Sequence, residues 1–357
     1  MRVQKIRHIF ECNLRFLLTW LILSAVACII YVFVVFGSLL NKTVLPSNNV
    51  PSTIPYITVP SEYNVFLEFT STPSAMSREY TGSIQMNFVA RDVTQQLFFH
   101  RGEKIKISSI TLEDSNGTTS SPTAGAYDKS TGVQAYIPIS NLTSQENYIL
   151  RINFKGELDF QNGGPEHLEY TLDNGTTRYS IAFGSSVTAS SGLRYLMPCL
   201  DAPDFSAVFN FNIRHSPRYR VISNFAGQTQ QSILYTATIF NASFAMDPSQ
   251  VALALIDTQL MPTTVQQSGL TVKLIIRTTM HAQNMKFQIN KYYRRNVVNT
   301  ISTERIIQFM AARSELIGKV DVLALPLLSA TQQPGITFYN ENDVIRENVD
   351  LGSIGSV

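Results

Sequence analysis

Hydrophobic and polar residues alternate along most of the chain between residues 58 and 260, in short runs separated by Gly, Ser, Asn and Pro. Alternation puts every second side chain on the same face, which is typical of half-buried β-strands. No helical period lies between the runs, so the pattern predicts an antiparallel β-sandwich of about 200 residues. Strands are predicted at residues 63–69, 82–89, 97–100, 105–107, 148–154 and 209–213.

The pattern changes after residue 262. One more strand is predicted at 270–276, and a stretch without Gly or Pro then runs from 279 to 316 with apolar residues at helical spacing. Two further strands are predicted at 321–325 and 335–339. The predicted organisation is therefore a mainly β chain with a sandwich at 58–262, followed by the incomplete start of an α/β domain at 263–357.

The first 40 residues predict a membrane anchor. Residues 16–40 contain no charge, and a helix of that length would extend about 37 Å, enough to cross a hydrocarbon core of about 30 Å. A buried core helix and a cleaved signal peptide are the alternatives, but the apolar run exceeds the roughly 7–15 residues usual in signal peptides. Basic residues precede the span. The positive-inside rule thus predicts a cytosolic tail at 1–15, a signal anchor at 16–40 and an extracellular stalk at 41–57.

Composition and charge narrow the class of protein. The 357 residues include 28 Lys and Arg against 26 Asp and Glu, and only 15% are charged. This balance excludes a broad nucleic-acid-binding surface and a disordered charged tail. Three cysteines exclude a disulfide-stapled scaffold, and Cys199, alone on the predicted outer side, is expected to be buried.

Five N-x-S/T sequons lie on the predicted extracellular side and are candidate glycosylation sites. They begin at Asn41, Asn116, Asn141, Asn174 and Asn241.

The segment at residues 194–209 carries the most specific pattern in the chain. Its residues Arg194, Pro198, Cys199, Asp201, Pro203, Ala207 and Phe209 match, at the same spacing, a signature of the aminopeptidase N-type (gluzincin) zinc metallopeptidases, R-x-x-F-P-C-F-D-E-P-x-x-K-A-x-F. Weaker resemblances to this family follow its order at 80–82, 221–224, 240–257 and 316–326. The resemblance implies a saddle-shaped N-terminal β-sandwich and the start of a thermolysin-like catalytic domain.

The chemistry of that family requires zinc, held by H-E-x-x-H on a helix and by a later Glu. The five histidines, His8, His100, His167, His215 and His281, include no H-E-x-x-H. In the family the zinc helix lies beyond the point that matches residue 339, so it is expected past residue 357. No catalytic residue, metal ligand or cofactor is therefore predicted within this chain.

Residue types that contact substrate in the family are also replaced. The family has G-x-M-E-N just before the point that matches residue 335, and its Glu binds the free α-amine of the peptide. Gln332 and Gln333 supply no carboxylate there. In the sandwich, Val187, Ala189 and Ala202 stand where the family has Gln, Glu and Glu. Without the carboxylate, an ammonium group taken into a cleft lacks an ion-pair partner, so free-amine selectivity should be lost.

The leading hypothesis is a membrane-anchored, non-catalytic glycoprotein at the plasma membrane. Its expected partners are peptides, extracellular proteins or a full-length paralogue, and not nucleic acid. The alternatives are a fragment or short isoform of a zinc aminopeptidase, and an incomplete product whose partial second domain exposes apolar surface. No nucleophile elbow, Walker loop or C-x-x-C pair suggests other chemistry.

Overall fold

The computed structural model describes residues 50–69, 78–158, 164–171, 175–184, 192–242, 244–257, 261–267, 270–276, 319–325 and 331–340. All of them belong to one compact unit, residues 48–357. The predicted anchor at 16–40 and the predicted helix at 279–316 lie outside these residues. Within them, no helix is long and apolar enough to cross a membrane.

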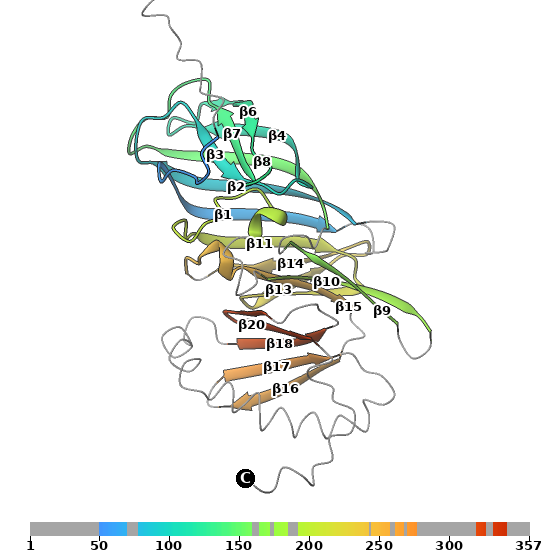
Figure 1. The fold of residues 1–357 in the computed structure, drawn as a ribbon. Coiled ribbons are helices and arrows are strands. Elements are labelled where there is room, and N and C mark those ends of the chain that lie inside the picture. Colours follow the sequence, from blue (N-terminus) through green and yellow to red (C-terminus); the bar gives the residue numbers. More distant parts are fainter. Residues whose placement is uncertain are drawn as a thin grey trace, which may run out of the picture. The chain divides into compact units, whose positions relative to one another are not determined.

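The largest sheet has eight strands in the order β13-β14-β11-β1-β2-β8-β4-β5 (Figure 1). Its strands are β1 (Thr58–Phe69), β2 (Glu79–Ala90), β4 (Lys106–Glu113), β5 (Thr119–Ser120), β8 (Asn147–Glu157), β11 (Val208–His215), β13 (Gly227–Gln231) and β14 (Thr236–Phe240). β1 and β11 are parallel, whereas the other pairs of this sheet are antiparallel. The expectation of a purely antiparallel sandwich is therefore wrong at this pair, where the chain returns in the same direction after crossing the second sheet.

The second sheet has four strands in the order β12-β15-β10-β9, and a three-stranded sheet has the order β3-β7-β6. The four-stranded sheet comprises β9 (Glu166–Thr171), β10 (Thr177–Gly184), β12 (Tyr219–Ser223) and β15 (Ala252–Asp257). The small sheet comprises β3 (Leu97–His100), β6 (Thr123–Tyr127) and β7 (Val133–Ile137). Two 3-10 turns, η2 (Leu193–Tyr195) and η3 (Pro248–Gln250), lie in the connections.

The main core lies between the eight-stranded and the four-stranded sheets. β2 buries every second residue, and so does β1 from Tyr63 onward, as their sequence alternation predicts. From the four-stranded sheet, Phe183, Leu253 and Leu255 enter the same core. The opposite face of that sheet is also covered, because all six residues of β15 are buried.

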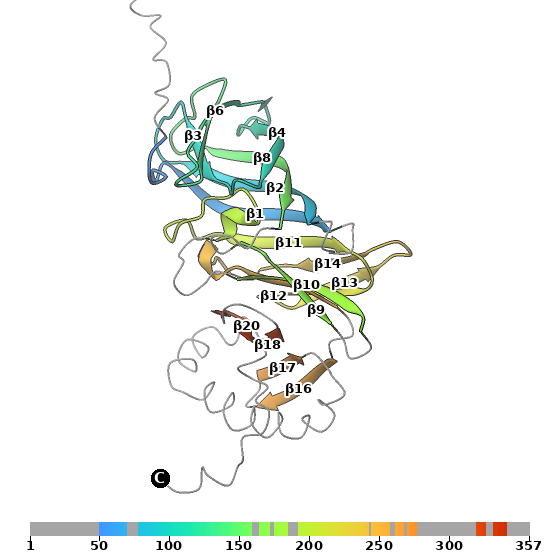
Figure 2. The same ribbon diagram turned by 45° about the vertical axis from the view of Figure 1, so that its right-hand side comes forward.

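A third layer covers this opposite face (Figure 2). It is a five-stranded sheet in the order β16-β17-β18-β20-β19. Its strands are β16 (Met261–Gln267), β17 (Leu270–Ile276), β18 (Lys319–Leu325), β19 (Thr331–Gln333) and β20 (Ile336–Asn340). β16 runs across residue 262, and its Pro262 is tolerated because β16 is an edge strand. Leu323, Leu325, Ile336 and Phe338 share a buried cluster with Ala182, Ala252 and Ala254.

Two glycines allow aromatic rings to cross the strands of the main sheet. A Cβ on Gly82 would lie 2.4 Å from the ring of Phe154, and one on Gly156 would lie 2.2 Å from that of Tyr80. In the β2–β8 register Gly82 is opposite Phe154, and Tyr80 is opposite Gly156. Each ring therefore lies over the glycine of the partner strand, an arrangement that shields glycine in a sheet.

The predicted strands at 63–69, 82–89, 97–100, 148–154, 209–213, 270–276 and 321–325 all lie within observed strands, so these predictions are confirmed. The predicted strands at 105–107 and 335–339 are displaced by one residue at their start, to β4 and β20.

Candidate functional site

The matched segment at 194–209 forms the connection between the two sheets of the sandwich. It leaves η2, pairs through Cys199 with His100 at the end of β3 and enters β11, and six of its first eight residues are buried. A buried connection needs partners for its backbone groups, because unpaired N–H and C=O groups away from water are unfavourable. The side chains around this segment provide those partners.

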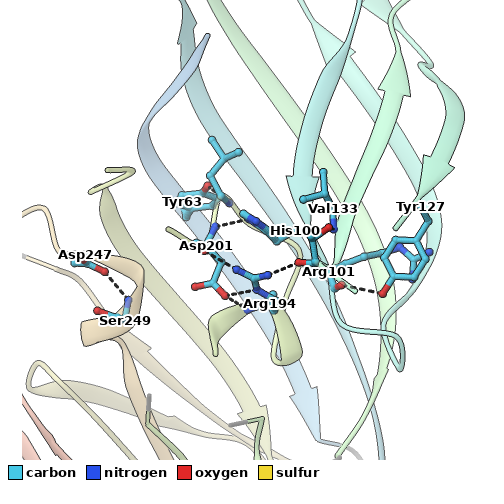
Figure 3. Close-up of polar contacts among 11 residues, drawn as sticks. Tyr63, His100, Arg101, Tyr127, Val133, Arg194, Asp201, Asp247 and Ser249 are labelled. Atoms are coloured by element: carbon cyan, nitrogen blue, oxygen red, sulfur yellow. Dashed lines mark hydrogen bonds and ion pairs between the residues drawn. The ribbon is translucent and has the colours of Figure 1, made fainter. Parts of the chain in front are cut away.

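Arg194 and Asp201 form an ion pair at the centre of the segment (Figure 3). The Arg194 Nε lies 2.8 Å from Asp201 Oδ2, and its Nη2 donates to the Asp201 carbonyl oxygen at 2.8 Å. Its Nη1 donates to the carbonyl oxygen of Thr131 in the β6–β7 loop. The Asp201 side chain is fully buried and that of Arg194 is 13% exposed. The guanidinium thus joins the start and the middle of the segment to the β6–β7 loop of the small sheet.

Residues of strands β1, β2 and β3 also form hydrogen bonds with this segment. The Leu200 N–H donates to Tyr63 Oη at 3.1 Å, and the Asp201 N–H donates to His100 Nδ1 at 3.1 Å. The backbones of His100 and Cys199 exchange two hydrogen bonds, of 2.8 and 3.0 Å. Tyr80 Oη donates to the Leu196 carbonyl oxygen at 2.7 Å. These hydrogen bonds either lie within the segment or join it to residues about 60 to 140 positions away in the chain.

Burial shifts the pKa of three titratable side chains in this cluster. Burial, aided by the nearby Arg194 charge, lowers the pKa of His100 to about 3, so its ring is neutral and Nδ1 remains an acceptor. Burial raises the pKa of Asp201, while the Arg194 guanidinium opposes that shift. Burial also raises the pKa of the Cys199 thiol well above its usual range, so the sulfur is a protonated core atom and not a nucleophile.

The structure brings most of the matched residues together. Phe209 stacks on Tyr63 at 4.9 Å between ring centroids, and Ala207 exchanges two backbone hydrogen bonds with Met246. Pro198 is buried with the ion pair, whereas Pro203 is exposed. The burial predicted for Cys199 is confirmed. Sequence reasoning missed the contributions of Tyr63, His100 and Thr131, because a strand pattern alone does not indicate which distant loop a side chain meets.

β19 forms a second candidate site, at the edge of the five-stranded sheet. It pairs antiparallel with β20, with Gln333 opposite Ile336 and Thr331 opposite Phe338. Thr331 approaches the sandwich at Gly184, where a Cβ would lie 3.0 Å from Thr331 Oγ1. Gln332 and Gln333, singled out from the sequence, thus lie on the edge strand β19 of this sheet.

Polar contacts from Asn224, the residue after β12, and from Lys319 of β18 hold the turn that follows β19. Asn224 Nδ2 donates at 2.8 Å to the carbonyl oxygens of both Gln250 and Pro334, and its Oδ1 accepts from the Ala252 N–H. Lys319 Nζ donates to the Ser223 carbonyl oxygen. The turn that joins β19 to β20 is therefore bound directly to the sandwich.

The histidines in the described part of the chain lie on three separate strands, His100 on β3, His167 on β9 and His215 on β11. No group of three His, Cys, Asp or Glu side chains that could hold a metal occurs among the described residues. His100 Nδ1 accepts from a backbone N–H, and both ring nitrogens of His215 lie 3.0 Å from polar partners. His8 and His281 lie outside the part of the chain that the structure describes, as do Val187 and Ala189.

Three of the five sequons lie in described loops or turns. Asn116, Asn141 and Asn241 are all exposed. Asn116 occupies a tight turn in which its N–H donates to Asp114 Oδ1 at 2.9 Å. Asn41 and Asn174 lie outside the described residues.

Comparison with known proteins identifies the family. The profile of the peptidase M1 N-terminal domain matches residues 59–249, which is more than half of the chain. The chain belongs to the M1 peptidase family. The match covers the eight-stranded sheet from residue 59 onward and β9, β10 and β12 of the four-stranded sheet, and it includes the cluster around Arg194 and Asp201.

Individual M1 relatives are distant and much longer. The chain is 22% identical over 294 residues to the human thyrotropin-releasing hormone-degrading ectoenzyme, a match that covers 80% of this chain and 26% of that protein. It is 21% identical over 294 residues to the mouse protein of the same name. It is 24% identical over 171 residues to the puromycin-sensitive aminopeptidase of Caenorhabditis elegans, covering 48% of this chain and 17% of that one. The chain thus spans about a quarter or less of these relatives.

Proposed function

We propose that this M1-family chain is a membrane-anchored glycoprotein of the cell surface that binds peptides or proteins without hydrolysing them. Its peptide contact would be the edge of β19, where an extended chain can add as a further strand. The signature segment would keep the sandwich rigid next to that edge.

The main support for this proposal is that the chain keeps the framework residues of the family signature and lacks the residue types that contact substrate in the family. The buried residues that tie the two sheets together, Arg194 and Asp201 above all, match the family. At the edge strand, the residues are Thr331, Gln332 and Gln333, with no carboxylate to pair with a free amine. An amide can accept a hydrogen bond from a peptide but does not offset the desolvation of an ammonium group.

The proposed location rests on separate observations. The uncharged segment at 16–40 has the length and flanking charges of a signal anchor. Three exposed sequons at Asn116, Asn141 and Asn241 agree with an extracellular sandwich. One relative is named an ectoenzyme, which supports a surface location for this chain as well.

The first test is hydrolysis. The full chain, expressed in mammalian cells and purified in detergent, is assayed with aminoacyl-arylamides in the presence of added zinc. We expect no turnover above that of a mock purification. Turnover that a chelator abolishes would overturn the proposal and favour the alternative, a zinc aminopeptidase of the family type.

The second test addresses selectivity at β19. Binding of a fluorescent extended peptide is compared for its free and its acetylated N-terminus, and the wild type should bind both within about threefold. Gln332→Glu and Gln333→Glu are then tested separately. Neighbouring strand residues point to opposite faces, so one carboxylate should restore a preference of roughly tenfold for the free amine. The other variant serves as its control. A strong preference of the wild type for the free amine, or no binding of either peptide, would contradict the proposal.

A further inference from the structure

β13 is an unusually accessible edge of the eight-stranded sheet. Among the described residues its backbone pairs only with β14, and all five of its residues are exposed. The exposed run is longer than the strand and extends over residues 226–235. No charged residue occurs between Arg220 and Asp247. An exposed strand edge with free N–H and C=O groups is a template for pairing with another chain.

Two other edges in the described part of the chain carry the usual protection. At the opposite end of the same sheet, β5 is only two residues long. At the edge of the four-stranded sheet, β9 carries Glu166 and Glu169. Short strands and charged side chains both discourage pairing between edges. β13 is five residues long and carries no charged side chain. Its Gln and Thr side chains can hydrogen-bond to the same side chains of a second copy.

The tip of the β13–β14 hairpin is apolar. Ile233 is 97% exposed and Leu234 is 85% exposed, and the Ser232 N–H donates to the Tyr235 carbonyl oxygen at 2.9 Å across them. Two-residue hairpin turns favour Asn and Gly in left-handed conformations, and neither Ile233 nor Leu234 has a positive φ. Local turn chemistry therefore does not explain these two residues, and such departures are expected at functional sites.

The hairpin is also held in place. Its last pairs with β11 join Thr236 to His215, so the turn extends past the end of that strand (Figure 2). The Arg214 guanidinium lies 4.3 Å from the centroid of the Tyr235 ring and pairs with Glu68 at 2.9 Å. A preorganised edge loses little conformational entropy on binding, which favours association.

We propose that β13 pairs with β13 of a second copy of this chain, antiparallel about a two-fold axis. A two-fold axis places the residues closest to it near their own counterparts, so a charge there would meet a like charge. The uncharged strand avoids this repulsion, whereas an edge such as β9 would not. This inference goes beyond the proposed peptide-binding role, because it uses a different sheet edge.

The register follows from the strand itself. Centring the axis on Thr229, the middle residue of β13, pairs all five residues of each copy and places Gln228 opposite Gln230 of the other. In this register Ile233 lies beside residues 225–226 of the other copy, where Ala226 is exposed. The exposed Ala226 thereby adds an apolar contact to the tip, and apolar contact favours a stable interface.

Disulfide trapping in the full chain tests the pairing. Thr229→Cys, expressed at the surface of mammalian cells and oxidised mildly, should form a disulfide-linked dimer on a non-reducing gel. Thr119→Cys on β5, at the opposite edge of the same sheet, is the matched control and should stay at the background of the wild type with its three cysteines. Equal trapping of the two variants would overturn the proposal, as would an adduct of Thr229→Cys with a different protein in place of the dimer.

Charged variants of β13 distinguish a loss of pairing from a loss of folding. The double variant Gln228→Lys with Gln230→Lys should reduce the dimer fraction by roughly tenfold, because like charges then face each other. The double variant with Glu at both positions should do the same. Co-expression of the two should restore a mixed dimer, which a misfolded protein would not form. Dimer fractions that are unchanged by both variants, or not restored on mixing, would overturn the proposal.

Discussion

Lowering the pH should destabilise the folded chain through His100. Its Nδ1 accepts the Asp201 N–H at 3.1 Å, so protonation at this nitrogen would set two N–H groups against each other. The site is buried and lies near the Arg194 charge, and together these lower the pKa to about 3 from an ordinary value of 6.5. Between these two values the unfolded chain binds a proton at His100 and the folded chain does not. Stability therefore rises with pH across this window and is lost as the pH falls.

The expected size follows from this window. Each pH unit below 6.5 removes about 1.4 kcal/mol of the free energy of unfolding, so His100 should account for about 2 kcal/mol by pH 5. The assay is pulse proteolysis of the full chain in urea, in detergent, at pH 7.5 and pH 5. The variant His100→Asn keeps an acceptor oxygen near the Nδ1 position and does not titrate in this range.

The quantity compared between the wild type and His100→Asn is the change in the free energy of unfolding from pH 7.5 to pH 5, and not its value at either pH. Burial also lowers the pKa of His167 and of His215, and both contribute equally to the wild type and the variant. We expect His100→Asn to lose about 2 kcal/mol less than the wild type between pH 7.5 and pH 5. Equal losses in the two proteins would refute the reasoning, even if the variant is less stable at both pH values.

Two further predictions concern the same cluster. Arg194→Met should lower the free energy of unfolding by about 3–5 kcal/mol because it leaves the buried Asp201 charge unpaired. In the same urea assay, Lys104→Met removes an exposed ion pair and should change the free energy of unfolding by less than about 0.5 kcal/mol. Equal effects of the two variants would contradict the role of Arg194. Cys199 should resist a membrane-impermeant maleimide on intact cells until denaturant unfolds the chain, because its thiol is buried with a raised pKa; labelling of the folded protein would show that the segment opens.

Local sequence pattern was sufficient for nine of the twenty strands in the described part of the chain. In β1 and β2 the alternation of apolar and polar residues matches the alternation of buried and exposed side chains. It was insufficient for β15, whose six residues are all buried because a third layer covers the second face of its sheet. Burial on both faces removes the alternation on which strand prediction depends.

The spacing of residues 194–209 was enough to indicate the family and to predict that Cys199 is buried. It did not reveal that Tyr63 and His100 hold the segment, nor that β1 and β11 run parallel. It also did not reveal that Gln332 and Gln333 lie on an edge strand. The sequence by itself determined which side chains avoid water, because that preference is local to each residue. Only the tertiary structure decided which of them meet, because contacts such as those of Tyr63 and His100 join segments about 100 or more residues apart and form only when the sheets pack together.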